Sequence, residues 1–338
     1  MANNTTTADL VTDLATPPDV TQTYFVRKLL MNARIYNYHE RWADPVDLPQ
    51  GEGRNIIVRR YAHLPIAGQL SQGVPPTGRV PTLDDFTVAL VQHGDFVALT
   101  DIARWTQKDP IVNKFTELIG LQIGYTIDTY IRNIIVNGTN VLFSNGTART
   151  DVVTILDGND LDRLQRSLWI NGAEFVLGGN GGSSNVGTAP TMPAYACIVH
   201  PRTVFTLQNI AGFKDASQYR GAAEGEYGRY KSLAFFMATD PSSLGIGAAV
   251  TTGAGGNSTV VTNTSGVADI YHTLAIGKHA YHQVKLNGKS TTFHVKPMGS
   301  AGTADPLDQL STIGAKHTGA GLITNQNWES RLEHAVEL

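Results

Sequence analysis

The sequence is poor in charge and contains a single cysteine. Asp, Glu, Lys and Arg make up 16% of its 338 residues, against roughly 25% in ordinary soluble domains. So low a share is typical of a β-rich protein with many turns, or of a protein whose surface is covered by partners. The net charge of −3 excludes a global basic character with which to hold nucleic acid through its phosphates. The one cysteine, Cys197, excludes an internal disulfide framework, and its apolar setting YACIV indicates a buried, inert thiol.

The sequence also lacks long apolar runs and a secretory signal. The sequence has no stretch of about 18 consecutive apolar residues, so it predicts no membrane span and no membrane partner. The opening residues, MANNTTTADL, lack the basic segment and following apolar run of a secretory signal.

Motifs that carry catalysis are absent as well. The Gly-Lys-Ser at 288–290 is no phosphate loop, because Gln283 stands where that loop needs a glycine. There is no Gly-x-Ser-x-Gly elbow and no His-Glu-x-x-His pair. His282 and His294 could meet across a turn at Asn287-Gly288, but two imidazoles alone make a weak metal site, and ordinary sheet histidines explain them better. The sequence therefore predicts no enzyme, no cofactor and no metal.

What is present begins with an arm. Residues 1–22 are polar and contain Pro17 and Pro18, which is typical of an extended segment. TYFVRKLLMNARIY then places Phe25 and Leu29 on one face of a modest amphipathic helix.

A ribbon follows the arm. Residues 54–61 and 86–91 predict two strands that pair around a long excursion rich in Pro and Gly. A two-stranded ribbon is marginal in water by itself, so we expect this one to lie on another subunit. After it, His93-Gly94-Asp95 is typical of a hairpin turn between two further strands.

The clearest helix spans 109–137. Its apolar residues recur with the 3.6-residue period, Asp109 and Pro110 suit its start, and Gly138 suits its end. Such a helix is on the order of 40 Å long and suits a scaffold that spans the subunit.

An α/β core is predicted in the middle of the chain. Its elements are a helix at about 160–169 capped by Asp160, a buried strand AYACIV, a helix opened by HPRTVFTLQNI, and a strand in GRYKSLAFFMATD. The Gly/Ser/Thr-rich tract 242–267 is typical of a surface insertion.

The C-terminal third predicts two hairpins. AYHQVKLNGKSTTFHVKP carries Asn287-Gly288 between alternating runs, the signal of a type I′ turn. TIGAKHTGAGLI and NWESRLEHA would form the second hairpin, joined at Thr324–Gln326. Its first strand would be central, with both faces covered, and its second would have one wet face and close the sheet.

Six segments stand in a distinctive order along the chain. They are RKLLMNAR at 27–34, IIVRRYAHLPIAGQLSQGV at 56–74, VQHGDFVALTDI at 91–102, LIGLQIGYTIDTYIRNIIVNG at 118–138, EGEYGRYKSLAFFMATD at 224–240 and DPLDQLSTIGAKHTGAGLI at 305–323. Together they resemble the major capsid protein of tailed double-stranded-DNA bacteriophages, in the branch typified by the short-tailed N4-like phages. Many relatives carry Glu-Gly-Val where this chain has Gln72-Gly73-Val74, so a charged contact is missing there.

The resemblance implies an α+β, HK97-like fold divided along the chain. Residues 1–53 would be an N-terminal arm, 54–108 an extended β-arm (E-loop) and its return, and 109–144 the spine helix of a peripheral domain. Residues 145–270, with the insertion 242–267, would form an axial domain, and 271–338 would supply closing sheet to both domains.

The resemblance also implies function and partners. The chain would assemble with itself, as pentamers and hexamers, into an icosahedral head in the virion, enclosing genomic DNA without sequence-specific binding. A separate scaffolding protein, a portal protein and a cement or decoration protein would be further partners. Intersubunit contacts would involve Leu64, Leu70, Gln72, Val74, Arg79, Phe25 and Leu29. The alternatives are another β-rich virion or surface protein, such as a tail tube or adhesin, and, more remotely, a hydrolase with an unfamiliar site.

Overall fold

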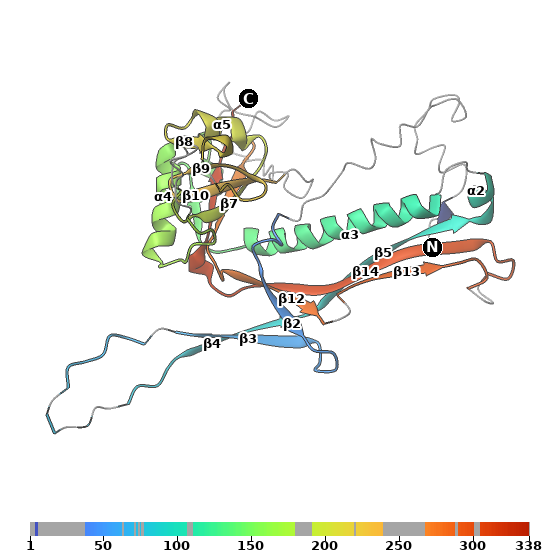
Figure 1. Cartoon of the computed structure of the whole chain (residues 1–338), viewed down its shortest axis with the longest axis horizontal. Helices are drawn as coiled ribbons and strands as arrows, with labels where there is room; N and C mark the ends of the chain where they lie inside the picture. Colours follow the sequence, from blue (N-terminus) through green and yellow to red (C-terminus); the bar gives the residue numbers. More distant parts are fainter. Residues whose placement is uncertain are drawn as a thin grey trace.

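The fold consists of two bodies and a projecting ribbon. The structure is a computed structural model that describes residues 4–5, 38–62, 64–70, 72–73, 75, 78–106, 111–179, 191–219, 221–238, 268–287, 290–300 and 305–337. Figure 1 shows a long lower body made of a sheet and one long helix, an upper body at one end of it, and a two-stranded ribbon that runs out beneath the upper body.

The lower body is built on a six-stranded sheet around β14 (Leu310–Ile323). β5 (Val91–Thr100) runs antiparallel along one edge of β14, from Leu310 opposite Thr100 to Gly319 opposite Val91. The other edge of β14 carries β12 (Tyr281–Leu286) and β13 (Thr291–Lys296) one after the other. Two short parallel additions complete the sheet, β2 (Asp44–Leu48) beside β12 and β1 (Asn4–Thr5) beside β5.

The long helix α3 (Ile111–Val136) lies along this sheet, as Figure 1 shows. Ile119 and Ile123 on the helix pack against Ile313 and Ala315 on β14 in one buried cluster. The sequence prediction of a long helix is thereby confirmed, and the Gly138 N–H donates to the Ile135 carbonyl oxygen (2.9 Å) just beyond the helix end. Asp109 and Pro110, predicted to start the helix, lie outside the described residues. The short α2 (Asp101–Thr106) stands at the far end of the sheet.

The upper body holds a seven-stranded sheet flanked by helices. Its strands, in spatial order, are β6 (Val141–Phe143), β15 (Glu329–His334), β11 (Tyr271–Ile276), β7 (Tyr195–Val199), β10 (Leu233–Met237), β9 (Glu226–Tyr230) and β8 (Phe213–Asp215). Its helices are α4 (Gly158–Ile170) and α5 (Thr203–Asn209). Short 3-10 turns occur at Arg149–Asp151, Ala216–Gln218 and Gln326–Trp328. Leu161, Leu164 and Leu168 of α4 pack on Tyr195 and Phe235 of the sheet, which confirms the predicted α/β core.

Two local details of this core differ from the prediction. Asp157, not Asp160, is the N-cap of α4. The Asp157 N–H donates to the Asp160 carboxylate in a capping box. The segment predicted as one strand is an antiparallel pair, β9 and β10, joined at Lys231, whose φ of 50° makes the tight turn.

Both predicted C-terminal hairpins are wrong. β12 and β13 do not pair with each other, because each pairs with a different part of β14. β14 and β15 belong to different sheets, so the chain crosses from the lower to the upper body between them. β14 is central, as expected, but β15 has no wet face, since Glu329, Ser330, Leu332, Glu333 and His334 are all buried.

The predicted turn at His93-Gly94-Asp95 is also wrong. These residues lie within the continuous strand β5, opposite His317, Lys316 and Ala315 of β14. A Cβ on Gly94 would stand 3.0 Å from the Ala315 carbonyl oxygen. The glycine therefore serves a close approach of two strands rather than a turn.

Candidate assembly surface

The ribbon is the part of the chain with the least support from its own body. β3 (Asn55–Tyr61) and β4 (Leu83–Ala89) pair antiparallel, with Asn55 opposite Ala89 and Tyr61 opposite Leu83. They make a separate two-stranded sheet, which confirms the predicted pairing. Exposure alternates along both strands, so the ribbon has a half-buried inner face and an exposed outer face.

The inner face anchors the ribbon to the lower body. Ile56 and Val88 pack beside the buried Leu48, Leu90 and Val284 in a small apolar cluster at its root. Further out, the Arg60 guanidinium donates to the Thr324 carbonyl oxygen (2.8 Å) and to Asp84 (2.7 Å). These contacts fix the direction in which the ribbon leaves the body.

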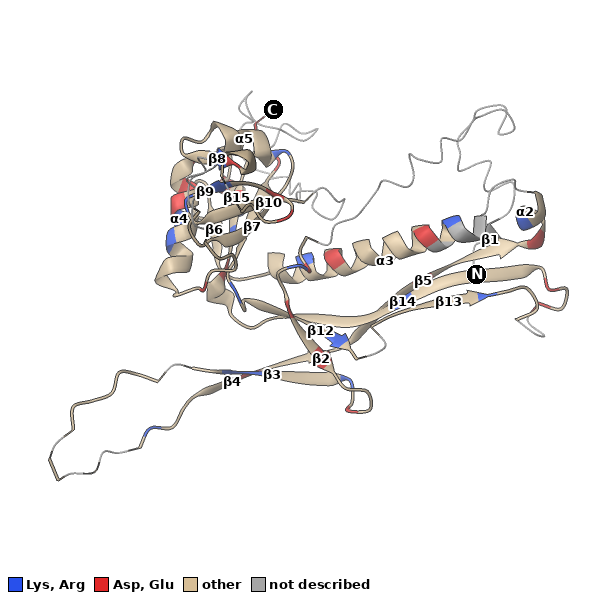
Figure 2. Ribbon diagram, in the orientation of Figure 1, with Lys and Arg blue, Asp and Glu red and all other residues tan. Residues whose placement is uncertain are grey.

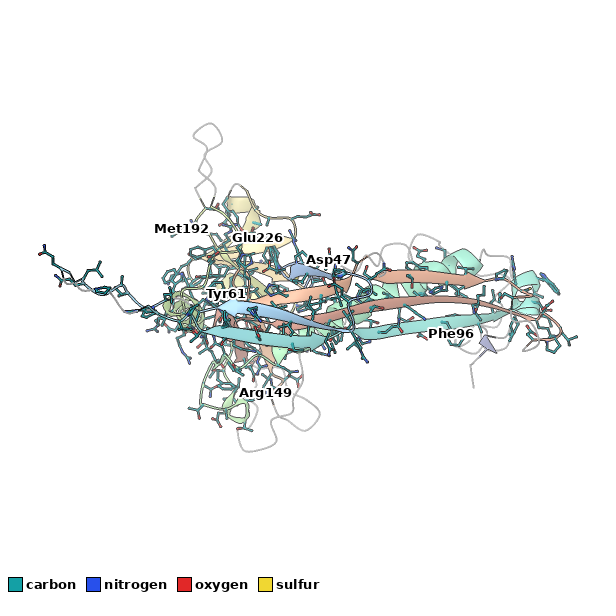
Figure 3. All side chains as sticks on the ribbon, turned by 90° about the horizontal axis from the view of Figure 1, so that it is seen from below. Asp47, Tyr61, Phe96, Arg149, Met192 and Glu226 are labelled. Atoms are coloured by element: carbon teal, nitrogen blue, oxygen red, sulfur yellow. The ribbon has the colours of Figure 1, made fainter. Side chains whose placement is uncertain are left out.

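The outer face has no such partner among the described residues. Ile57, Tyr61 and Leu83 are exposed there, and Figure 3 shows Tyr61 on the ribbon where it passes under the upper body. An ion pair on this face joins Arg59 to Asp85 at 2.7 Å. Hydrogen bonding from Arg59 lowers the pKa of the Asp85 carboxyl. A surface pair of this kind keeps the cross-strand register but adds little stability.

Beyond the strands lies the tip, residues 62–82. Its root is closed by the Ala62 N–H donating to the Thr82 carbonyl oxygen (3.1 Å), and Arg79 donates to the Pro65 carbonyl oxygen (3.2 Å). Every described side chain in it is exposed. The tip contains no Asp or Glu, and Figure 2 shows it almost free of charged residues. An apolar extension of this kind is typical of a segment that is covered by another molecule.

The predicted contact residues divide into two groups. Leu64, Leu70, Gln72 and Arg79 lie in the tip and are exposed, Leu64 at 61% and Leu70 at 70%. Val74, Phe25 and Leu29 lie outside the described residues, so their part in contacts stays a prediction. Ile66 (93% exposed) and Val80 (88%) belong with the first group and were missed, although large apolar side chains in a turn-rich segment were a usable signal.

Two more exposed apolar groups were missed by sequence reasoning. Ile102 and Trp105 (73%) protrude from α2 at the far end of the lower body, and Trp169 and Ile170 (78%) protrude from the C-terminal end of α4. Both helices carry apolar residues on more than one face, which distinguishes them from helices that bury a single stripe.

The interior offers no catalytic arrangement among the residues that the structure describes. Cys197 is fully buried, and burial raises the pKa of its thiol well above the usual range. His282 is hydrogen-bonded to Thr324 (3.1 Å). His294 lies on β13, opposite Gly314 of β14, so the two histidines do not meet. No group of three or more His, Cys, Asp or Glu side chains within the described ranges has metal-site geometry. None of the described helices is long and apolar enough to cross a bilayer.

Comparison with known proteins finds relatives in structure but not in sequence. No protein-family model and no curated protein matches the chain. The capsid protein of Ralstonia phage GP4 is similar with a TM-score of 0.62 at 10% identity, over 89% of each chain. The capsid structure of cyanophage P-SCSP1u gives 0.60 at 13% identity over 96% of this chain and 94% of that one. The capsid of cyanophage Pam1 gives 0.60 at 11% identity over 99% of both.

The fold is therefore that of tailed-phage capsid proteins, the HK97-like fold. The two bodies, the long helix and the projecting ribbon all fall within the matched length, since the matches cover nearly the whole chain. Identities of 10–13% show the shared fold alone.

Proposed function

We propose that this protein is a major capsid protein, a structural and non-enzymatic component of a bacteriophage head. The observation that carries the proposal is the ribbon, whose outer face and tip expose Ile57, Tyr61, Leu64, Ile66 and Leu70 to solvent in a single chain. A monomer gains nothing from such a surface, whereas a shell of repeated copies covers it at every contact. The shared fold of phage capsid structures supports the same conclusion.

The assembly that fits is an icosahedral shell of pentamers and hexamers around packaged double-stranded DNA. Each ribbon would lie over the lower body of a neighbouring copy. The N-terminal arm, 1–53, would cross adjacent subunits, and Phe25 and Leu29 would contact them. We place the protein in the virion, assembled in the cytoplasm of a bacterial host, and in the N4-like branch of these phages.

In this proposal the two bodies would be the two domains that the resemblance implies. The lower body would be the peripheral domain, with α3 as its spine, and the upper body would be the axial domain that faces the capsomer centre. Genome packing would shift these bodies against each other while the arms adjust. The net charge of −3 suits an inner wall that encloses DNA without gripping it.

Further partners follow from the same proposal. A separate scaffolding protein would direct assembly. A portal protein would occupy one vertex, and a cement or decoration protein would bind the outer surface. Recovery of normal heads from this chain expressed alone would contradict the separate scaffold.

Negative-stain microscopy of purified assemblies tests the proposal. Closed polyhedral shells are the expected result, while tubes would indicate a tail protein and small uniform particles an unassembled protein such as an enzyme. Replacing residues 63–81 with Asn-Gly keeps β3 and β4 paired and removes the tip. The shortened chain should fold, judged by an unchanged thermal unfolding midpoint, but should form no shells. Shells from the shortened chain would refute the role of the tip.

A further inference from the structure

The upper body meets the lower body at a buried junction. Ile131 and Ile135 near the end of α3 pack there against Ile198 on β7, Leu274 on β11 and Tyr281 on β12. The segment 38–43, at the base of the N-terminal arm, packs into the same cluster. Any shift of one body against the other must therefore change this junction.

His39 ties the arm base to both of its neighbours. Its backbone N–H donates to Asp128 on α3 (2.8 Å), and its ring Nδ1 lies 2.8 Å from the second oxygen of that carboxyl. Both side chains are almost completely buried. The Tyr281 hydroxyl donates to the His39 carbonyl oxygen (2.5 Å). One residue thus joins the arm, the long helix and the lower sheet.

A small cavity lies beside His39 and has two more histidines in its wall. His200 follows β7, His272 lies on β11, and the remaining lining is Ile198, Val199, Ala238 and Leu274. Its volume of about 10 Å³ is the room that one water molecule needs. Three imidazoles from three separate parts of the chain therefore border one water-sized space. Their arrangement is not that of a metal site within the described residues.

The surroundings of this cavity favour neutral imidazoles. Burial lowers the pKa of His272 to about 3, and the nearby His39, Arg331, Arg132 and His334 add to this effect. Burial, together with Arg202, lowers the pKa of His200 to about 4.

Two of the acids around the junction have cationic or imidazole partners. Asp128 is bound to His39. Glu333 on β15 is shared by Arg149 (2.5 Å) and Arg331 (2.9 Å). A positive charge on His200 or His272 would therefore lie mainly among cations and apolar side chains.

We propose that this histidine-lined junction is an acid-sensitive release between the two bodies. Protonation of His200 and His272 places positive charge in the wall of this cavity, beside His39 and Arg331. The charge is relieved when the upper body separates from α3 and the arm base and water enters. Release should precede the unfolding of either sheet, because backbone groups and not the three rings make the β5–β14 and β7–β11 pairings.

The direction of the pH effect follows from the depressed pKa values. An imidazole with a pKa near 6.5 when open and 3 to 4 when closed binds more protons in the open state. The closed junction is therefore fully stable above about pH 6.5 and weakens as the pH falls toward the closed-state values. For one such group, lowering the pH from 7.5 to 5.5 favours opening by about tenfold. His272 should approach this value, and His200, whose pKa is lowered less, should contribute less.

Hydrogen–deuterium exchange of the full, unassembled chain at pH 7.5 and 5.5 tests the proposal. After correction for the intrinsic pH dependence of exchange, residues 38–43 should exchange at least tenfold faster at pH 5.5, whereas residues 271–276, which are paired within the upper sheet, should change little. Residues 91–100 and 310–319 of the lower sheet should change little. His272→Gln should remove about tenfold of the acid effect and His200→Gln a smaller part. His294→Gln, on the exposed β13, is the matched control and should leave the effect unchanged.

Each other outcome overturns the proposal. It is wrong if the junction of the natural protein is equally protected at both pH values, or if all segments loosen together. It is also wrong if His272→Gln and His200→Gln respond to acid like the natural protein. The two substitutions serve as alternatives should one of them prevent folding at pH 7.5. Because the measurement uses unassembled chains, its failure would leave the capsid function untouched.

Discussion

The tip of the ribbon allows the energy of assembly to be separated from the energy of folding. Ile66 is 93% exposed in the single chain, so Ile66→Ser removes almost no buried surface from the folded subunit. Full burial of an isoleucine side chain contributes about 1.5–3 kcal/mol, and part of this is spent on ordering the contact. We expect a loss of about 1–2 kcal/mol for each intersubunit contact, which raises the concentration needed for assembly by about 5- to 30-fold.

The assay compares two midpoints for the same variant. Light scattering against protein concentration gives the assembly threshold, and urea denaturation gives the free energy of unfolding of the unassembled chain. Ile66→Ser should move the first and leave the second within about 0.5 kcal/mol, as is usual for exposed positions. Ile66→Leu keeps the apolar character and should assemble like the natural protein. An unchanged threshold for Ile66→Ser would refute the idea that the tip is covered in the shell.

Three further predictions concern the folded chain. Arg229→Met should lower the free energy of unfolding by about 3–5 kcal/mol in urea denaturation, because it leaves the buried Glu226 carboxylate without its cation. The double variant with Glu226→Gln should recover much of this loss. If the effects of the two substitutions simply add, the pairing is contradicted. Gly314→Ala should cost about 1–3 kcal/mol, since its Cβ would lie 2.9 Å from a side chain of β5, whereas Gly68→Ala in the open tip should be neutral; equal effects would contradict the strand packing. Cys197 should resist a thiol reagent until urea unfolds the chain, and rapid modification of the native protein would contradict its burial.

Local patterns in the sequence were enough for the elements with strong internal periodicity. The 3.6-residue repeat of isoleucines placed α3 within a few residues of its observed bounds, Ile111–Val136. The two alternating runs around the Pro- and Gly-rich excursion were enough to pair β3 with β4. In both cases the information lies within neighbouring residues, so no distant partner is needed to read it.

Pairing between distant strands could not be predicted in the same way. Asn287-Gly288 is a strong turn signal, but it cannot tell whether the flanking strands pair with each other or with a third strand. β14 is 14 residues long, which leaves room for both β12 and β13 along one edge. The glycine of His93-Gly94-Asp95 was misread for the same reason, because its partner, Ala315, lies at the other end of the chain.

The burial of β15 was hidden by its charges. Glu329, Arg331 and Glu333 alternate with smaller residues and suggest a wet face. In the fold, Glu333 accepts from Arg149, which comes from a 3-10 turn far earlier in the chain. Glu329 is enclosed instead, and burial raises the pKa of its carboxyl well above the usual range. Sequence alone does not reveal that a charged side chain will be buried in an ion pair with a residue distant in the chain.

The pairing of β5 with β14 also determines when the lower sheet can be completed during synthesis. β5 spans residues 91–100 and its long antiparallel neighbour spans 310–323, so most of the upper body is translated between the two strands. Until the ribosome releases the second, one edge of β5 lacks its main partner. Chains whose synthesis stops before β14 would leave that edge of β5 unpaired and would be prone to aggregation or degradation. Because the lower sheet closes late, only chains translated past β14 can complete it.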